Sequence, residues 1–435
     1  MTSLTHAKKE MRAGLLAVTQ VSNVGVLFRQ RERGLDFGVE HASKQLDTFE
    51  TNCVQVVENQ YFPAPTVFCG SIPASHNLGY SSAKNGAIGV YTLVKRLPPK
   101  KHSNYYYDPF QLLIRASLEL NCGGISTIDV WNNLLIAAGT DGSLSLVKLD
   151  GLHPPLEGEL PDLGEITWKT QAHLKKEQAT CTYPFKCSNN ASKFLQSQIV
   201  SVGCDGQVKL WDLQQGQNLA AFRTNKPLVD VIKLENQMQT VVTSSLDEIS
   251  LWDLRTSRPV ASACYPDDEA SRAERKGAPR NEFGGLFQIS DHHVLAVSGF
   301  HTNFQRTSWD IRKLDKPFQS ILAMEGHYHE HSCANSAYFN RQGGITVDSG
   351  GGHSILWSVD NGLITPESRA YFEGSGVIGV HANEDWSFGA FAVHNCGGNW
   401  LSDASAAAWA LPDKHQLTTL PSFKPDSKKV SCVAM

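Results

Sequence analysis

The chain has 435 residues, of which 41% are hydrophobic, so it can bury a large core. Its formal net charge of −4 gives no electrostatic case for binding nucleic acid. No stretch has the ~20 consecutive apolar residues that cross a bilayer as a helix, and the first residues lack the apolar core of a secretion signal. Ten cysteines without a CxxC pair predict reduced thiols of the cytosol or nucleus.

The first half of the chain contains strand-like units with loops between them. Residues 1–50 form a weakly patterned N-terminal segment, in which Leu15 to Val24 reads as one strand. A first unit runs from Cys53 to Val94 and carries Tyr91 near its end, and a second runs from Leu112 to Asp150. The long segment 151–193, rich in Pro, Glu and Lys, is predicted to be a surface insert that ends in an outer strand and a loop.

The clearest pattern lies between Gln198 and Arg255, where one unit occurs twice. Each copy has a short apolar run, a tight polar turn and an alternating run that ends in Leu-Trp-Asp-Leu. The two tryptophans, Trp211 and Trp252, are 41 residues apart. A period of about 40 residues with a terminal Trp-Asp is the signature of a WD-repeat propeller blade. One such sheet cannot bury both faces alone, so blades must stack around an axis.

Three more units follow a charged loop at residues 267–280, which is predicted to be a second surface insert. The fifth unit spans Gly284 to Ile321, the sixth Cys333 to Asn361, and the seventh Gly376 to Leu411. The predicted fold is therefore all-β, a seven-bladed WD-repeat β-propeller over residues 51–435. The N-terminal strand at Leu15 to Val24 is expected to complete the last blade and close the ring.

The recurring residues of the units are predicted to be structural, because glycine and aspartate suit the hairpin turns and a strand tryptophan suits packing between blades. Aspartates that end a strand are expected to accept local hydrogen bonds. The structural repeat positions are Asp141, Gly142, Asp205, Gly206, Trp211, Asp212, Asp247, Trp252, Asp253, Trp309, Asp310, His327, Trp357 and Trp409.

The candidates for chemistry are few. His327, His329 and His331 alternate, and on a strand they could meet a metal, but a loop before a strand is the favoured interpretation. The glycine-rich run 350–354 lacks the lysine of a phosphate loop and is predicted to be a hairpin turn. The basic, aromatic run 97–107 is interpreted as a solvated loop rather than an RNA contact. We therefore expect no catalytic, cofactor or metal site.

The order of the units resembles the forty-three-kilodalton WD-repeat nucleoporin family of the Y-shaped nuclear pore subcomplex. Four features carry the resemblance: QIVSVGCDGQVKLWDL followed by TVVTSSLDEISLWDLR, the upstream TQAH at 170–173, the run from Asp310 to Ile321 with SILWSVD, and NWLS at 399–402 with LTTLP. The chain departs from that family in a longer N-terminal segment, a longer loop at 267–280 and a fifth unit whose turn, HTNFQRT, lacks Asp-Gly.

The resemblance implies a non-catalytic scaffold at the nuclear envelope that supports pore assembly, mRNA export and protein transport, and that in some organisms visits kinetochores. Its implied partners are helical nucleoporins of the Y-complex, with no direct nucleic-acid contact, no membrane insertion and no small-molecule substrate. Two alternatives remain open: another WD-repeat adaptor, such as a methyltransferase-complex or ubiquitin-ligase subunit, and a WD-repeat hydrolase of diphthamide synthesis.

Overall fold

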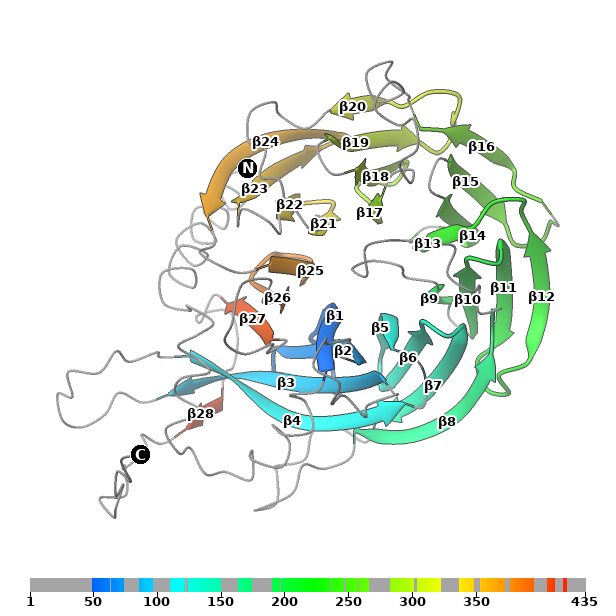
Figure 1. Cartoon of the computed structure of the whole chain (residues 1–435). Helices are drawn as coiled ribbons and strands as arrows, with labels where there is room; N and C mark the ends of the chain where they lie inside the picture. Colours follow the sequence, from blue (N-terminus) through cyan, green and yellow to red (C-terminus); the bar gives the residue numbers. More distant parts are fainter. Residues whose placement is uncertain are drawn as a thin grey trace, which may run out of the picture.

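The computed structural model of the chain contains strands and turns, with no helix in the part that it describes (Figure 1). The described residues are 49–62, 64–73, 86–96, 110–120, 122, 124–149, 163–173, 190–195, 197–235, 237–245, 248–256, 258–265, 282–300, 303–321, 336–347, 353–371, 376–394, 405–410 and 418–420. Within them, no helix is long and apolar enough to span a membrane.

Seven antiparallel sheets, here called blades 1 to 7, follow one another along the chain. Blades 1 to 3 consist of β1 (Phe49–Val57), β2 (Thr66–Pro73), β3 (Gly86–Arg96) and β4 (Phe110–Leu120); β5 (Ile125–Trp131), β6 (Leu134–Gly139), β7 (Ser143–Leu149) and β8 (Gly164–Gln171); and β9 (Asn190–Leu195), β10 (Gln198–Gly203), β11 (Gln207–Asp212) and β12 (Asn218–Arg223).

Blades 4 to 7 consist of β13 (Leu228–Leu234), β14 (Gln237–Ser245), β15 (Glu248–Asp253) and β16 (Ala261–Cys264); β17 (Glu282–Gln288), β18 (His293–Phe300), β19 (Asn303–Asp310) and β20 (Gln319–Ile321); β21 (Ser336–Asn340), β22 (Gly343–Val347), β23 (His353–Asp360) and β24 (Leu363–Tyr371); and β25 (Gly376–Ala382), β26 (Phe388–His394) and β27 (Ser405–Ala410). A short strand, β28 (Thr418–Leu420), pairs with β3 in parallel.

The blades stand side by side around a central axis, with β1, β5, β9, β13, β17, β21 and β25 innermost (Figure 1). This arrangement is a β-propeller, and the predicted all-β propeller fold is confirmed. The innermost strand of one blade contacts the innermost strand of the next, as for β5 with β9 and for β9 with β13. A closed ring covers both faces of every blade, which a single four-stranded sheet cannot do.

The core of the molecule lies between the blades, and the third-strand tryptophans build it. Trp211 of blade 3 packs against Ile136 and Leu146 of blade 2, and Trp252 of blade 4 packs against Val200 of blade 3. In the same way Trp309 packs against strands of blade 4 and Trp357 against strands of blade 5. Each tryptophan is at most 4% exposed. A buried indole is therefore the packing contact that recurs between one blade and the preceding one.

Two unit boundaries differ from the prediction. The second unit was expected to begin at Leu112, but Leu112 lies on β4, which pairs with β3 and is the outer strand of blade 1. The sixth unit was expected to end at Asn361, but β24 continues blade 6 beyond that turn. In both cases the outer strand lies beyond the point where the repeat pattern of the sequence stops.

Ring closure joins blade 7 to blade 1. Phe388 and Ala390 of β26 share a buried cluster with Val54, Val56 and Val67 of blade 1. The run Leu15 to Val24, predicted to supply a closing strand, lies outside the described residues. Of the predicted inserts, 267–280 also lies outside them, whereas 151–193 contains β8 and the start of β9.

Candidate functional site

One blade contains a complete hydrogen-bonded chain that ends on its tryptophan. The imidazole of His173, which is 1% exposed, is 2.9 Å from Asp205 Oδ1 through Nδ1 and 2.8 Å from Ser201 Oγ through Nε2. Trp211 Nε1 donates to the same serine oxygen at 2.8 Å. His173 lies at the end of the TQAH run, beyond β8, so the chain of contacts ties blade 2 to blade 3. These contacts satisfy buried polar groups and are structural.

The third-strand tryptophans of blades 4, 5 and 6 show how far this arrangement repeats. Trp252 Nε1 donates to Thr243 Oγ1 and Trp357 Nε1 to Thr346 Oγ1, each at 2.9 Å. Strand register places Ala296 at the matching position of blade 5, because Val294 lies opposite Trp309 as Val241 lies opposite Trp252. Alanine has no acceptor, and among the described residues Trp309 Nε1 has no hydrogen-bond partner.

The strand-ending aspartates hold the turns that follow them. Asp212 Oδ1 accepts from the backbone N–H of Gln214 and Gln215. Asp253 and Asp310 each receive a two-pronged bond from the arginine two residues later, with the shorter contact at 2.6 Å in both. The hydrogen bonds and the charge of these exposed arginines lower the pKa of Asp253 and Asp310 to about 2. These groups are placed for turn geometry.

The remaining predicted positions have simple placements. Asp141 Oδ1 accepts from Ser143 N at 2.9 Å. Gly142 and Gly206 occupy their turns with φ of +89° and +74°, a conformation that favours glycine. Asp247 and His327 lie outside the described residues. Only the backbone of Trp409 is described, and it pairs with Gly389 in blade 7.

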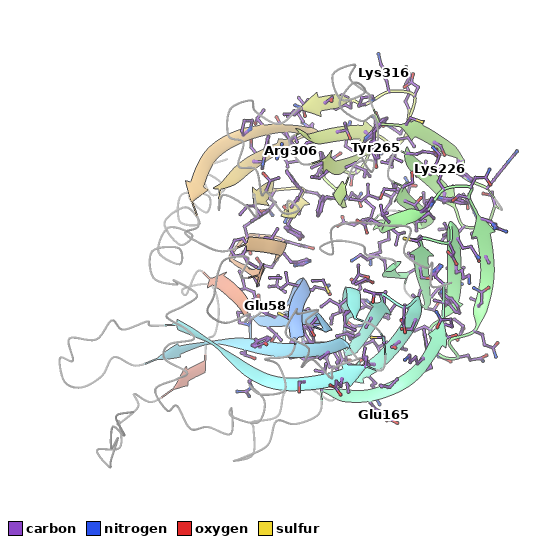
Figure 2. All side chains as sticks on the ribbon, in the orientation of Figure 1. Glu58, Glu165, Lys226, Tyr265, Arg306 and Lys316 are labelled. Atoms are coloured by element: carbon purple, nitrogen blue, oxygen red, sulfur yellow. The ribbon has the colours of Figure 1, made fainter. Side chains whose placement is uncertain are left out.

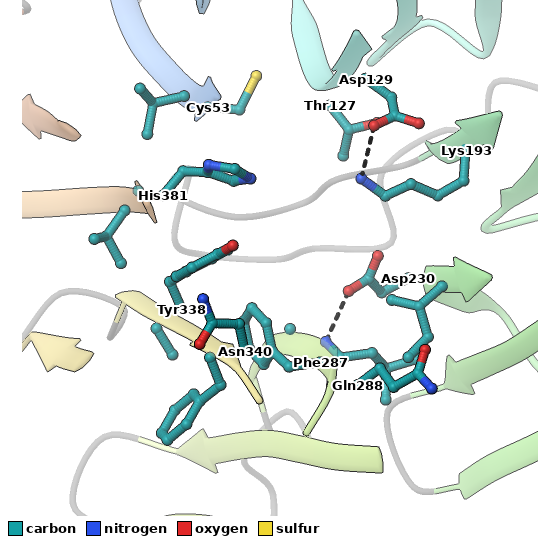
Figure 3. A pocket seen from close by; sticks show the side chains of 18 of the residues that line it. Cys53, Thr127, Asp129, Lys193, Asp230, Phe287, Gln288, Tyr338, Asn340 and His381 are labelled. Atoms are coloured by element: carbon teal, nitrogen blue, oxygen red, sulfur yellow. Dashed lines mark hydrogen bonds and ion pairs between the residues drawn. The ribbon is translucent and has the colours of Figure 1, made fainter. Parts of the chain in front are cut away.

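A cavity lies on the propeller axis, and the sequence did not indicate it. It has a volume of about 520 Å³, and residues from the innermost strands of all seven blades line it (Figure 3). This is within the usual range for ligand pockets, about 300–1,000 Å³. Figure 2 shows the side chains of the described residues on the ribbon of the ring. The central channel is therefore the candidate site.

Strand register places seven side chains of the innermost strands at one level of the channel. In each blade, one residue of the second strand lies opposite the tryptophan position, and the next residue of that strand pairs with the innermost-strand residue in question. Lys193 is paired in this way with Val200, and His381 with Ala390. This channel ring consists of Gln55, Asp129, Lys193, Ile232, Phe287, Tyr338 and His381. In blade order, its polar members are consecutive and span the closure from blade 7 to blade 3, whereas the members from blades 4 to 6 are apolar or aromatic.

The polar members of the channel ring tie neighbouring blades together. His381 Nδ1 accepts from Val56 N at 3.3 Å across the closure between blades 7 and 1. Asp129 accepts from Gln55 Nε2 and from Lys193 Nζ, each at 3.4 Å, which links blades 1, 2 and 3. One level away, Asp230 Oδ2 of blade 4 accepts from Leu286 N of blade 5 at 2.9 Å. These bonds make a polar seam through blades 7, 1, 2 and 3, with one further link between blades 4 and 5.

Burial and neighbouring charge set the protonation states in the channel. Burial, and then the charge of Lys193, lower the pKa of His381 to about 3, so its imidazole is neutral at pH 7. Burial lowers the pKa of Lys193, but the carboxylates of Asp129 and Asp230 outweigh burial, so the pKa is raised overall. Burial raises the pKa of Cys53 to about 12, so its thiol stays protonated. Cys53 therefore offers no thiolate nucleophile.

No sequence motif marks the channel ring, and geometry explains why. The ring residues of blades 3 to 6 precede their tryptophans by 18 to 22 residues, because the intervening hairpin turns differ in length. No fixed spacing therefore marks them. Lys193 also falls in the segment interpreted as an insert. Among the described residues, no three His, Cys, Asp or Glu side chains are placed to hold a metal ion.

No protein-family model matches the chain. Among solved structures, the chain is similar to the WD40 domain of Toxoplasma gondii coronin, with a TM-score of 0.53 and 14% identity over 85% of this chain and 87% of that chain. It is similar to Raptor of Chaetomium thermophilum, with a TM-score of 0.53 and 11% identity over 83% of this chain but only 28% of the Raptor chain. It is also similar to a chain of the outer coat vertex of COPII on membranes, with a TM-score of 0.54 and 11% identity over 83% of this chain and 88% of that chain. At identities this low, the structural likeness shows a shared WD40 propeller fold and no more.

Proposed function

We propose that this protein is a non-catalytic scaffold that binds other proteins. The observation that carries the proposal is that its conspicuous polar side chains make structural hydrogen bonds. His173, Asp205, Asp253 and Asp310 are engaged in bonds that hold turns and blades in place. A rigid ring of this kind presents turns and a channel mouth at fixed positions, which suits recognition of partners. Two of the similar structures, the COPII outer coat vertex and Raptor, support this proposal by their shared fold.

More specifically, we propose a subunit of the Y-shaped nuclear pore subcomplex that supports pore assembly, mRNA export and protein transport. The support is the resemblance carried by QIVSVGCDGQVKLWDL and TVVTSSLDEISLWDLR, which form β10–β11 and β14–β15 of two adjacent blades. The TQAH run of the same resemblance supplies His173. The proposed partners are helical nucleoporins, and the proposed location is the nuclear envelope, with kinetochores in mitosis.

Affinity purification of the tagged full chain from interphase cells, followed by mass spectrometry, tests both levels. Recovery of a stoichiometric set of Y-complex nucleoporins would support the nuclear pore proposal. A methyltransferase complex or a ubiquitin ligase in their place would support the scaffold and remove the nuclear pore. Recovery of no stable protein complex from interphase or mitotic cells would count against the scaffold itself. Imaging of the same tagged chain at the nuclear rim gives an independent check.

A further inference from the structure

The strongest unassigned feature is one mouth of the central channel, at the turns that follow the innermost strands. We propose that this mouth binds a basic side chain, an arginine carried on an extended peptide of a partner protein. The inference rests on the proposed scaffold function and specifies the chemistry of one partner. It stands on the position, charge and lining of the mouth.

Contacts between these turns show that they meet at a single mouth. Arg341, in the turn after β21, bridges Glu235 after β13 at 2.7 Å and Asp291 after β17 at 2.8 Å. Asn340 Nδ2 donates to the carbonyl of Glu384, after β25, at 3.0 Å. On the opposite side Asn59 Nδ2 donates to the carbonyl of Asn132, after β5. The mouth is therefore a rim of mutually braced turns.

The charge of the cavity favours a cation. Among the described residues that line it, Asp129, Asp230, Glu235 and Glu384 are acidic, and only Lys193 and Lys233 are basic. His381 is neutral at pH 7 and does not offset the difference. Four carboxylates against two ammonium groups leave two negative charges in a partly enclosed space. At the rim, Arg341 and Asp291 add one charge of each sign and leave this excess unchanged. An anionic peptide would add to this excess, whereas a guanidinium would reduce it.

The walls of the cavity suit the rest of an arginine side chain. Ile232 and Phe287 form an apolar wall along which an aliphatic stem can lie. Trp131, which is 37% exposed at the rim, offers an aromatic surface on which a guanidinium can stack. In the channel ring, the Lys193–Asp129 contact is 3.4 Å, longer than the usual ~2.7–2.9 Å of a charge-assisted bond. A planar guanidinium can make shorter bonds to a carboxylate than this lysine makes.

The test uses fluorescein-labelled peptides of glycine and serine with one central arginine, lysine, citrulline or glutamate, and measures polarisation on titration with the full chain. Citrulline keeps the shape of arginine and removes its charge. We expect the arginine peptide to bind, the lysine peptide to bind more weakly, and the citrulline and glutamate peptides to show no binding over the same range.

Charge variants at the rim give a signed control without touching the core. Glu384→Gln should weaken binding of the arginine peptide by about two- to fivefold, and Lys233→Gln should strengthen it by about the same factor. Lys313→Gln, whose lysine is 71% exposed on the outer side of blade 5, should leave it unchanged. The first two effects should shrink at about 0.5 M salt, because rim charges are screened.

Equal binding of the arginine and citrulline peptides would overturn the inference, as would shifts of the same sign for Glu384→Gln and Lys233→Gln. Absence of arginine-peptide binding up to about 1 mM protein would also overturn it. These outcomes differ from a failure of the scaffold proposal. If the Glu384→Gln and Trp131→Ala variants no longer bind the peptide but still co-purify with the same stable complex, the scaffold proposal stands and the channel has no part in recognition of that complex.

Discussion

The hydrogen bond from Trp252 Nε1 to Thr243 Oγ1 gives a quantitative test of how the blades are held. Both residues are 0% exposed, and the donor–acceptor distance is 2.9 Å. Thr243→Val replaces the hydroxyl with a methyl group of nearly the same size, so the packing of the strand is kept. The indole N–H loses its acceptor in a place that water does not reach. Leaving a buried donor without a partner costs roughly 1–3 kcal/mol.

The expected result is a loss of about 1–3 kcal/mol in the free energy of unfolding, measured by urea titration and followed by both circular dichroism and tryptophan fluorescence. Thr240→Val is the matched control, because Thr240 lies on the same strand, β14, and its side chain is only partly buried. That control should change the unfolding free energy by less than about 0.5 kcal/mol. A Thr243→Val variant as stable as Thr240→Val would refute the assignment of this bond as a stabilising contact.

Three further changes test other contacts. Ala296→Ser supplies the missing acceptor near Trp309 Nε1 and should add about 0.5–1.5 kcal/mol of unfolding free energy, whereas an unchanged or lower value would contradict the register argument. Gly216→Ala places a Cβ 2.6 Å from the ring of Trp168 at a φ of +63°, and should cost roughly 1–3 kcal/mol in the same titration, unlike an alanine at exposed Gln214. The folded-state pKa of His381 is lowered to about 3, so its contribution to stability is complete above about pH 6.5 and is lost as the pH falls toward 3. His381→Gln should therefore flatten the pH dependence of the unfolding free energy in that window relative to the wild type. Identical slopes for the two proteins would argue against a buried neutral imidazole.

The sequence was informative wherever a contact is local. The Asp-Gly turn at residues 205–206 and the Trp-Asp pair at 211–212 predict a hairpin and its outer end, because turn chemistry acts over a few residues. Tyr91 near the end of the first unit was also readable, and strand register places it opposite Val67, as Trp252 lies opposite Val241. These features were enough for the all-β propeller fold.

Contacts between blades were not readable in the same way. His381 accepts from Val56, 325 positions earlier in the chain, and Gln55 reaches Asp129 across 74 positions. Variable turns between strands remove any fixed spacing from such pairs. Likewise, the absence of an acceptor for Trp309 follows from Ala296 only once the register of β18 and β19 is known. The candidate site is therefore a product of ring closure, which no short motif encodes.

That dependence has a thermodynamic consequence for the proposed arginine site. The polar members of the channel ring span the closure between blades 7 and 1, so the lining of the channel exists only in the closed ring. A ligand that binds the closed ring and not the unfolded chain must stabilise it, by about 1.4 kcal/mol at ten times its Kd. The arginine peptide should therefore raise the urea midpoint of the wild type, and the citrulline peptide should not. A peptide that binds in polarisation assays without raising the midpoint would be held by a surface that survives opening of the ring, and the channel would not be its site.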